Sequence, residues 1–185
     1  RNRFSNHMRI LSGLYKGKKI HAPKNLPVRP TTDQAKEALF NILNNNFYIT
    51  DTIILDIFSG TGNISYEFAS RGSKHITSVD INNKCINFIK SVSNELSFNL
   101  KTIKSDVYKF IKSCNLDFDI IFADPPYNFE IEKYEKLISL IIKKNLLKND
   151  GLLIIEHSKN ISLKNSKNYS ESREYGRCCF SFFKS

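Results

Sequence analysis

Residues 53–62 read IILDIFSGTG, an apolar run that leads into an acidic residue and a pair of glycines. The run predicts a buried strand over residues 53–58, and the helically spaced apolar residues after it predict a helix that stops at residues 71–72. Gly60 and Gly62 let the backbone turn tightly between these elements and approach a ligand closely. A strand, a glycine turn and a helix in this order are typical of the first unit of a doubly wound α/β sheet.

The rest of the chain continues this alternation of short apolar strands and amphipathic helices. Strands are predicted over residues 75–79, 100–103, 118–123, 152–155 and 177–183, and helices over residues 33–43, 81–96, 107–111 and 134–142. Strands that are apolar throughout are buried on both faces, and intervening helices permit parallel pairing. We therefore expect an α/β fold with one doubly wound, Rossmann-like sheet, and a surface loop over the polar residues 159–172.

The first 50 residues depart from this alternation. Residues 8–20 predict a basic hairpin with two glycine turns, and Thr32 or Asp33 is placed to cap the helix that follows. We expect residues 1–50 to form a small basic N-terminal extension, a hairpin plus a helix, packed on a core domain of residues 51–185.

The net charge of +10 is concentrated at the two ends of the chain. Residues 1–32 contain eight Lys and Arg and no acid, whereas residues 33–156 sum to −2 and residues 157–185 to +4. A general compositional bias toward lysine would raise the charge everywhere, but it would not remove every acid ahead of Asp33. Clustered cations bind phosphates and release counterions, so this pattern predicts a nucleic-acid partner.

The remaining composition excludes several classes of protein. No apolar stretch approaches the ~18–20 residues of a membrane span, and the N-terminus lacks the apolar core of a secretory signal. The four cysteines form no CxxC pair and have no metal-binding spacing to histidine, so we expect reduced structural cysteines and no metal. We also expect a cytoplasmic location and a monomer.

Acidic residues stand at the ends of four predicted strands: Asp56, Asp80, Asp106 and Asp124. An acid about 20 residues beyond the first glycine, here Asp80, is placed to accept hydrogen bonds from ribose hydroxyls, and Asp106 could receive an adenine amino group. Any one of the four could instead be a helix cap or a turn residue. Together they suit the cationic sulfonium of S-adenosylmethionine and would repel a pyrophosphate. Ser65 also replaces the third glycine of the dinucleotide fingerprint.

The motif Asp124-Pro125-Pro126-Tyr127 follows the strand over residues 118–123. An aromatic exocyclic amine is a poor nucleophile because its lone pair is delocalised into the ring. Asp124 and the carbonyl of Pro125 can accept hydrogen bonds from both N–H groups, which draws the nitrogen toward tetrahedral geometry, and Tyr127 offers a ring for stacking. An ordinary turn also uses Asp and Pro. Downstream of the glycine loop, however, the motif predicts an S-adenosylmethionine-dependent N-methyltransferase.

Motifs along nearly the whole chain from residue 8 resemble the RsmD family, bacterial enzymes that methylate the 2-amino group of a guanine in small-subunit (16S) ribosomal RNA. The motifs are MRILSG at residues 8–13, KGKK at 16–19, RPTTD at 29–33, KEALFN at 36–41, DIFSGTG at 56–62, EFASRG at 67–72, DPPY at 124–127 and YG at 175–176. The RPTTD segment is more specific than the shared methyltransferase core. Ser59 and residues 63–66 depart from the smaller, more apolar residues usual there.

The resemblance implies a class I methyltransferase that binds S-adenosylmethionine and 16S ribosomal RNA, free or within the small subunit. The residues expected to hold and align the base are Asp124, Pro125, Pro126 and Tyr127. The candidates for cofactor binding are Asp56, Phe58, Gly60, Gly62, Asp80, Ile81, Asp106, Val107 and Asp124. The candidates for RNA binding are Arg9, Lys16, Lys18, Lys19, Arg29, Thr31 and Thr32.

A DNA adenine N-methyltransferase is the alternative, because it uses a similar acid-Pro-Pro-aromatic motif on an amine. Such enzymes usually carry a separate target-recognition region, for which this chain has little room. A protein glutamine methyltransferase would more often have Asn at position 124. A non-catalytic RNA-binding module would not need the intact motifs, and a nicotinamide dehydrogenase would need the missing third glycine.

Overall fold

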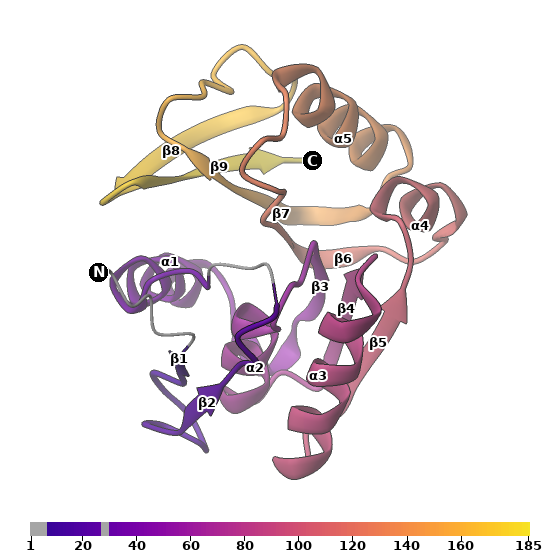
Figure 1. The fold of residues 1–185 in the computed structure, drawn as a ribbon. Helices are drawn as coiled ribbons and strands as arrows, with labels where there is room; N and C mark the ends of the chain where they lie inside the picture. The colour runs from indigo at the N-terminus through magenta and orange to yellow at the C-terminus, as the bar shows by residue number, and fades with distance from the viewer. Residues whose placement is uncertain (1–6, 27–29) are drawn as a thin grey trace.

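The computed structural model describes residues 7–26 and 30–185, which form a seven-stranded sheet with helices on both faces (Figure 1). The strands are β3 (Ile53–Ile57), β4 (His75–Asp80), β5 (Leu100–Lys104), β6 (Phe118–Ala123), β7 (Leu147–Ser158), β8 (Tyr169–Tyr175) and β9 (Cys178–Lys184). Their order is β5-β4-β3-β6-β7-β9-β8. The first five are parallel, and β9 and β8 add antiparallel strands at one edge. The predicted α/β, doubly wound sheet is confirmed.

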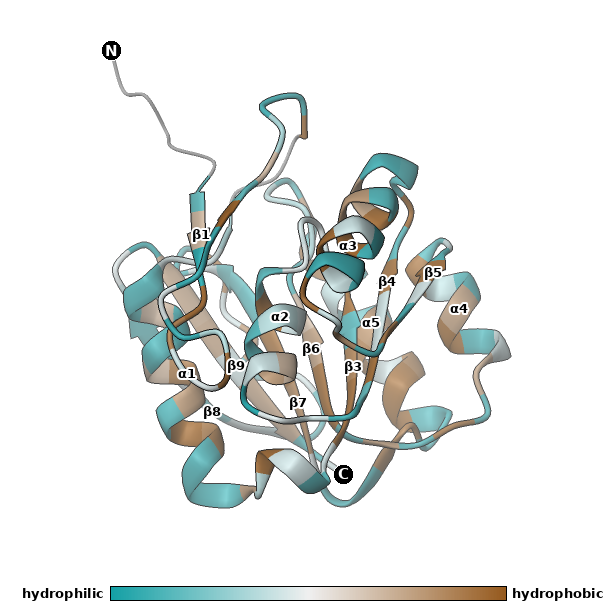
Figure 2. Cartoon of the chain, turned by 90° about the horizontal axis from the view of Figure 1, so that it is seen from below, coloured by the Kyte–Doolittle hydropathy of each residue, from teal (hydrophilic) through white to brown (hydrophobic). Residues whose placement is uncertain are grey.

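The two faces of the sheet carry different helices. Helices α1 (Asp33–Asn46) and α2 (Asn63–Ser70) pack on one face against β-strand residues such as Ile54 and Phe122. Helices α4 (Val107–Ser113) and α5 (Ile131–Lys143) pack on the other face. Helix α3 (Asn83–Glu95) shares a cluster with Tyr66 of α2. In Figure 2 the strands are mainly hydrophobic, whereas the outer helix surfaces are hydrophilic. Burying these apolar runs is the main drive for the fold.

The helices begin where side chains satisfy their first backbone N–H groups. Thr32 caps α1 by accepting from the Ala35 N–H at 3.2 Å, which decides between the two predicted caps. Asn82 caps α3, and Asp106 caps α4 by accepting from the Lys109 N–H at 2.9 Å. Such caps fix the direction in which each strand-to-helix connection leaves the sheet. A short 3-10 helix, η1 (Ile49–Asp51), leads into β3.

The predicted basic hairpin is present as β1 (His7–Arg9) and β2 (Lys19–His21), which pair antiparallel with Met8 opposite Ile20. Both of these apolar side chains pack with Tyr66 of α2 and Ile89 of α3. The hairpin therefore rests on the helical layer of the core, with its lysines directed to solvent.

A buried ion cluster fastens the hairpin and α1 to α2. Lys36 and Glu67 are only 1% and 0% exposed, and their charged groups are 3.2 Å apart. The Glu67 carboxylate also accepts from the backbone N–H groups of Leu11 and Ser12 and from Arg71 Nε, all at 3.0 Å. Lys36 Nζ donates to the Arg9 carbonyl at 2.6 Å and to Asn63 at 2.8 Å. Every charge in this cluster is thus matched by hydrogen-bond partners.

The prediction of a loop over residues 159–172 is wrong in its last part, because β8 begins at residue 169. This strand is polar and lies at the sheet edge, so it lacks the continuous apolar run that marks the inner strands. Its backbone is held by antiparallel pairing to β9, and its tyrosines Tyr169 and Tyr175 contact Phe183 and Phe180. Tertiary pairing, rather than local hydrophobicity, makes this segment a strand.

Among the described residues, all four cysteines are free, and Cys85, Cys114 and Cys179 are buried. No helix in the described ranges is long and apolar enough to cross a membrane.

Candidate active site

The carboxyl ends of the central strands lie side by side at one edge of the sheet. Ile57 of β3 is in register with Val79 of β4 and with Ala123 of β6, and Ala123 is in register with Ile155 of β7. The residues that follow on these strands therefore meet at the same edge. This edge is where open α/β sheets bind ligands.

The glycine loop after β3 has an unusual backbone. Phe58, Gly60 and Gly62 all have positive φ angles, of 54°, 53° and 84°. A Cβ atom at position 62 would lie 2.7 Å from the ring of Tyr66, so only glycine fits there. A bulky residue with positive φ, as at Phe58, is held only where its surroundings enforce it, and such residues cluster at ligand sites. The strain marks this loop as part of the site.

Asp80, at the end of β4, holds this loop in place. Its two carboxylate oxygens accept from the backbone N–H groups of Gly60 and Asn82, both at 2.8 Å. The next residue, Ile81, is 64% exposed, which is unusual for a large aliphatic side chain. The buried hydroxyl of Ser59 has no hydrogen-bond partner among the residues that the structure describes. Three side chains near the loop therefore fit a nucleoside-like ligand. The Asp80 carboxylate fits the ribose, the exposed Ile81 side chain fits the adenine ring, and the Ser59 hydroxyl fits the polar end.

The neighbouring strand end carries the other two candidates for cofactor binding. Lys104 of β5 is in register with Asp80, so Asp106 comes two residues beyond the same edge. Asp106 is exposed but already caps α4, and Val107, the first residue of that helix, is buried. The structure thus brings Gly60, Asp80 and Ile81 together and sets Asp106 beside them.

Asp56 lies inside the protein rather than on the surface of this edge. Its carboxylate is 2% exposed and accepts from the Ser65 hydroxyl at 2.5 Å, and Ser65 also contacts the Ser78 hydroxyl at 2.7 Å. Burial, reinforced by the charge of Asp80, raises the pKa of Asp56 to about 7. The serine that replaces the third fingerprint glycine therefore links β3, α2 and β4. A direct cofactor contact by Asp56 stays a prediction.

Asp124 directly follows β6 and opens the motif predicted to hold a base. No group among the described residues donates a hydrogen bond to its carboxylate. Burial raises its pKa well above the usual range, and the charges of Glu156 and then Asp56 add to the rise. The following turn is closed by the Phe129 N–H, which donates to the Pro126 carbonyl at 2.9 Å. Tyr127 projects from the turn with 88% of its surface exposed, as a ring available for stacking.

Glu156, near the end of β7, was missed by the sequence predictions. It follows Ile155, the register partner of Ala123, so it lies beside Asp124 on the neighbouring strand. The Thr31 hydroxyl donates to Glu156 Oε2 at 2.6 Å. Burial raises the pKa of Glu156 to about 7 and that of the nearby Cys178 thiol to about 12, where the Glu156 and Asp124 charges contribute. Its place after the apolar run of residues 152–155 is the signal that could have identified it.

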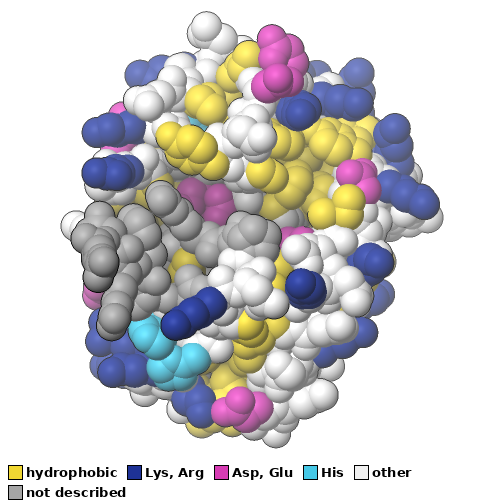
Figure 3. Space-filling model, viewed as in Figure 1, with side chains coloured by type: hydrophobic (Ala, Val, Ile, Leu, Met, Phe, Trp, Pro, Cys, Tyr) yellow, Lys and Arg dark blue, Asp and Glu magenta, His cyan; other side chains and the backbone are white. Residues whose placement is uncertain are grey.

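A cavity of about 700 Å³ opens among residues that follow the two acids in the chain. Tyr127, Ser158, Lys159, Asn160 and Arg177 line it. Ser158 lies two residues beyond Glu156 on β7, and residues two apart share a face of a strand. Figure 3 shows acidic side chains recessed near the middle of this face, with Lys and Arg side chains around its edge. The cavity is therefore lined by basic, polar and aromatic residues, most of which follow the two acids closely in the chain.

The candidates for RNA binding are divided among three environments. Lys16, Lys18 and Lys19 are exposed on the hairpin, where Lys18 pairs with Glu95 at 2.8 Å, and Arg9 pairs with Asp33 at 3.1 Å. Thr31 is buried and directed to Glu156, and Thr32 is used as the α1 cap. Arg29 lies outside the described residues.

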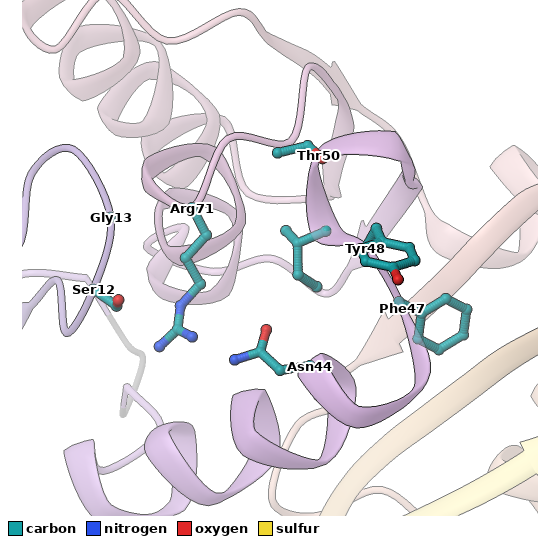
Figure 4. Close-up of a pocket in the computed structure, with 8 residues that line it drawn as sticks. Ser12, Gly13, Asn44, Phe47, Tyr48, Thr50 and Arg71 are labelled. Atoms are coloured by element: carbon teal, nitrogen blue, oxygen red, sulfur yellow. The ribbon is translucent and has the colours of Figure 1, made fainter.

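A second cavity, of about 410 Å³, lies away from this chemistry (Figure 4). Its lining includes Ile49 and Thr50, which precede β3, so it is at the amino end of that strand. Arg71 and Asn44 extend toward the same opening. None of the residues predicted to bind the cofactor or the base lines it.

Comparisons with known proteins agree with this geometry. Residues 8–184 match the family model described as conserved hypothetical protein 95. The ribosomal RNA small subunit methyltransferase D of Haemophilus influenzae is 34% identical over 90% of this chain and 87% of its own length, and that of Buchnera aphidicola subsp. Baizongia pistaciae is 36% identical over 84% and 78%. The solved structure of yhhF from Escherichia coli is 26% identical, with a TM-score of 0.82 over 96% of this chain and 97% of that chain.

Proposed function

The chain belongs to the conserved hypothetical protein 95 family, and from this membership we propose that it is an S-adenosylmethionine-dependent ribosomal RNA methyltransferase. Its substrate is the 16S RNA of the small subunit, a proposal supported by relatives that are named ribosomal RNA small subunit methyltransferase D. The group methylated is the exocyclic 2-amino group of a guanine. The observation that carries this is the donor-free carboxylate of Asp124, set between the strained glycine loop and the exposed ring of Tyr127.

The residues around the glycine loop fit S-adenosylmethionine. Asp80 would accept from the ribose hydroxyls, Ile81 would cover the adenine ring, and Asp106 would receive the adenine amino group. Gly60 and Gly62 would let the backbone lie against the ligand. When bound, S-adenosylmethionine supplies an electrophilic methyl group on a cationic sulfonium, which suits an edge lined with carboxylates.

Asp124 and Pro125 act on the amine of the base. The Asp124 carboxylate accepts a hydrogen bond from one N–H of the amine and the Pro125 carbonyl accepts from the other, so that the nitrogen lone pair is localised and aimed. A carboxylate with a raised pKa is also a stronger base, so Asp124 can take the proton that the nitrogen must lose after it gains the methyl group. Both roles are open to Asp124, because no donor in the described part of the chain engages its carboxylate.

The cavity that Tyr127, Lys159 and Arg177 line admits the base. A guanine must leave its stack to reach the recess, and Tyr127 offers the ring on which it can stack. Lys159 and Arg177 at the rim can contact the phosphates on either side of it. We further propose that the protein works as a monomer in the cytoplasm, where its RNA substrate is made.

The test is transfer of labelled methyl from S-adenosylmethionine to unmodified 16S RNA, bare and in assembled small subunits, followed by nucleoside analysis. Labelled 2-methylguanosine is the expected product, and the better substrate of the two identifies the assembly state that is recognised. DNA is included as a third substrate. Label in DNA adenine and none in RNA would instead establish the adenine methyltransferase alternative.

A further inference from the structure

Glu156 is a half-buried acid that the proposed mechanism does not use. It lies beside Asp124 because the preceding residues of β6 and β7, Ala123 and Ile155, are in register. Parallel strands are about 4.8 Å apart, so the two side chains emerge as neighbours. Both continue the face of the sheet that carries Phe122 and Ile154, which pack together on the α1 side. The two carboxyl groups therefore share one recess.

The partners of Glu156 leave hydrogen-bonding capacity free. Thr31 donates one hydrogen bond, to Oε2, and the Cys178 thiol is a weak donor within reach. A carboxylate can accept about four hydrogen bonds. Its pKa of about 7 reflects burial that these two partners do not offset. Two half-buried carboxyl groups with few donors among the described residues are suited to a ligand that brings several donors of its own.

We propose that Glu156 is a specificity-determining residue that accepts a hydrogen bond from the N1–H of the target guanine, an inference that rests on the proposed function. Guanine presents the N1–H directly beside the 2-amino group. If Asp124 accepts from the amine, the neighbouring acid on β7 is the group next in line for N1–H. The Thr31 hydroxyl positions Glu156 for this contact through Oε2.

This arrangement discriminates between bases by chemistry rather than by size. Adenine also has an exocyclic amine, but its adjacent N1 atom is a hydrogen-bond acceptor. An ionised carboxylate facing that atom would meet a lone pair and would lose the hydrogen bond that it needs when it is withdrawn from water. The second acid therefore favours guanine and works against adenine at the same position, which a single acid could not do.

The test compares guanine with 2-aminopurine at the methylated position of a small-subunit RNA, at pH 8, where Glu156 with its pKa of about 7 is mainly ionised. The analogue keeps the reactive 2-amino group but lacks the hydrogen on N1. We expect the wild-type protein to prefer guanine by about 10- to 100-fold in kcat/KM, the effect of a lost hydrogen bond to a charged group. The variant Glu156→Gln offers an amide that can donate to N1, so its preference should fall below about threefold. The difference between the two ratios isolates the contact because other changes in the analogue affect both proteins alike.

Matched variants separate recognition from folding. Thr31→Val removes the donor to Glu156 and should reduce the preference for guanine, whereas Thr31→Ser keeps the hydroxyl and should retain it. Glu174→Gln, an exposed acid on β8, should behave as wild type. Thermal unfolding and S-adenosylmethionine affinity show that each variant is folded.

Two results would overturn the inference. One is a wild-type protein that shows no preference for guanine over 2-aminopurine. The other is a Glu156→Gln variant that keeps the full preference for guanine, and an equal loss of activity on both RNAs in that variant would make Glu156 structural. A wild-type protein that methylates neither RNA, while folded and binding S-adenosylmethionine, would remove the proposed function itself and the inference with it.

Discussion

Carboxylates are withdrawn from water in two places of the molecule, completely at Glu67 and partly at Asp124 and Glu156, and their hydrogen bonding differs. Glu67 accepts from two backbone N–H groups, from Arg71 and from Lys36, and it is completely buried. Asp124 has no donor among the described residues, and its neighbour Glu156 has a hydroxyl and a thiol. The same chemical group is thus fully satisfied in the first place and largely unsatisfied in the second.

The number of hydrogen-bond donors around each carboxylate distinguishes an acid that stabilises the fold from an acid that is available to a ligand. A buried ion pair with complete hydrogen bonding holds parts of a structure together, and breaking it exposes a charge to an apolar interior. The Lys36–Glu67 cluster does this between the hairpin, α1 and α2. An acid that is withdrawn from water and has no donors lowers the stability of the folded protein. Such an acid is retained where a ligand supplies the missing donors. Asp124 and Glu156 fit that case, since a guanine edge brings N–H groups.

The largest expected effect is the loss of methyl transfer in Asp124→Asn. The amide keeps the shape but loses the charge and one acceptor, so we expect kcat to fall about a thousandfold, with S-adenosylmethionine affinity unchanged. Single-turnover transfer to small-subunit RNA measures it. Asp119→Asn is the control, because Asp119 is on the same strand but accepts from the Ile53 N–H at the opposite end. Retention of full activity in Asp124→Asn would place the aligning group elsewhere.

The next effect is on the stability supplied by the Lys36–Glu67 cluster. Glu67→Gln leaves the Lys36 ammonium buried beside a neutral amide, so we expect the free energy of unfolding to fall by about 3 kcal/mol, measured by urea denaturation. The double variant Lys36→Met/Glu67→Gln should recover part of this loss because the unpaired charge is gone. An exposed control, Glu174→Gln, should change little. If Glu67→Gln were as stable as the control, the cluster would not be what fastens the hairpin.

The third effect is a change in pH dependence. The folded pKa of Glu156, about 7, exceeds its ordinary value of 4.5, so the folded state keeps a proton that the unfolded chain releases. The stabilising contribution of this group is complete at low pH and is lost as the pH rises from about 4.5 to 7. Glu156→Gln cannot titrate, so its stability relative to wild type should rise by about 1–3 kcal/mol over that window. Urea denaturation at pH 5 and 7.5 measures this, and an equal difference at both values would contradict it.

The smallest expected effect is on RNA binding, and it compares paired with unpaired lysines of the hairpin. Lys18 is paired with Glu95, whereas Lys16 and Lys19 have no acidic partner within the described part of the chain. Lys16→Ala/Lys19→Ala should therefore weaken RNA binding and reduce the slope of log affinity against log salt by about 1–2, and Lys18→Ala should change it less. Filter binding across a salt series measures the slopes. Equal slopes in all variants would remove the hairpin from the RNA interface.

The sequence predicted the strands that are apolar throughout, since buried parallel strands carry that pattern in the chain itself. It also predicted the glycine loop and the acid-Pro-Pro-aromatic motif, because both are contiguous. It did not predict β8, whose polar sequence YSESREY becomes a strand only by pairing with β9. Patterns within one segment cannot show what another segment supplies.

The same limit applied to the site. Glu156 and Thr31 are 125 residues apart, so their hydrogen bond has no local signature. Asp56 resembled the other acids at strand ends, but the alternation of side chains and the Ser65 hydroxyl place it inside. Asn63 and Ser65, which depart from the family pattern, are used internally: Asn63 contacts Lys36 and the Thr31 carbonyl. The chemistry was readable from the motif, whereas the second acid depended on strand register.

The most direct test of the contrast between the two places is the stability of Asp124→Asn at pH 8. An acid without donors destabilises the folded state when ionised, so we predict that the variant unfolds at higher urea, with a free energy of unfolding about 1 kcal/mol above wild type. Because the same variant is expected to lose methyl transfer, stability and activity would move in opposite directions. A loss of stability of more than about 1 kcal/mol would show that the Asp124 carboxylate is satisfied in the folded protein and would contradict this account.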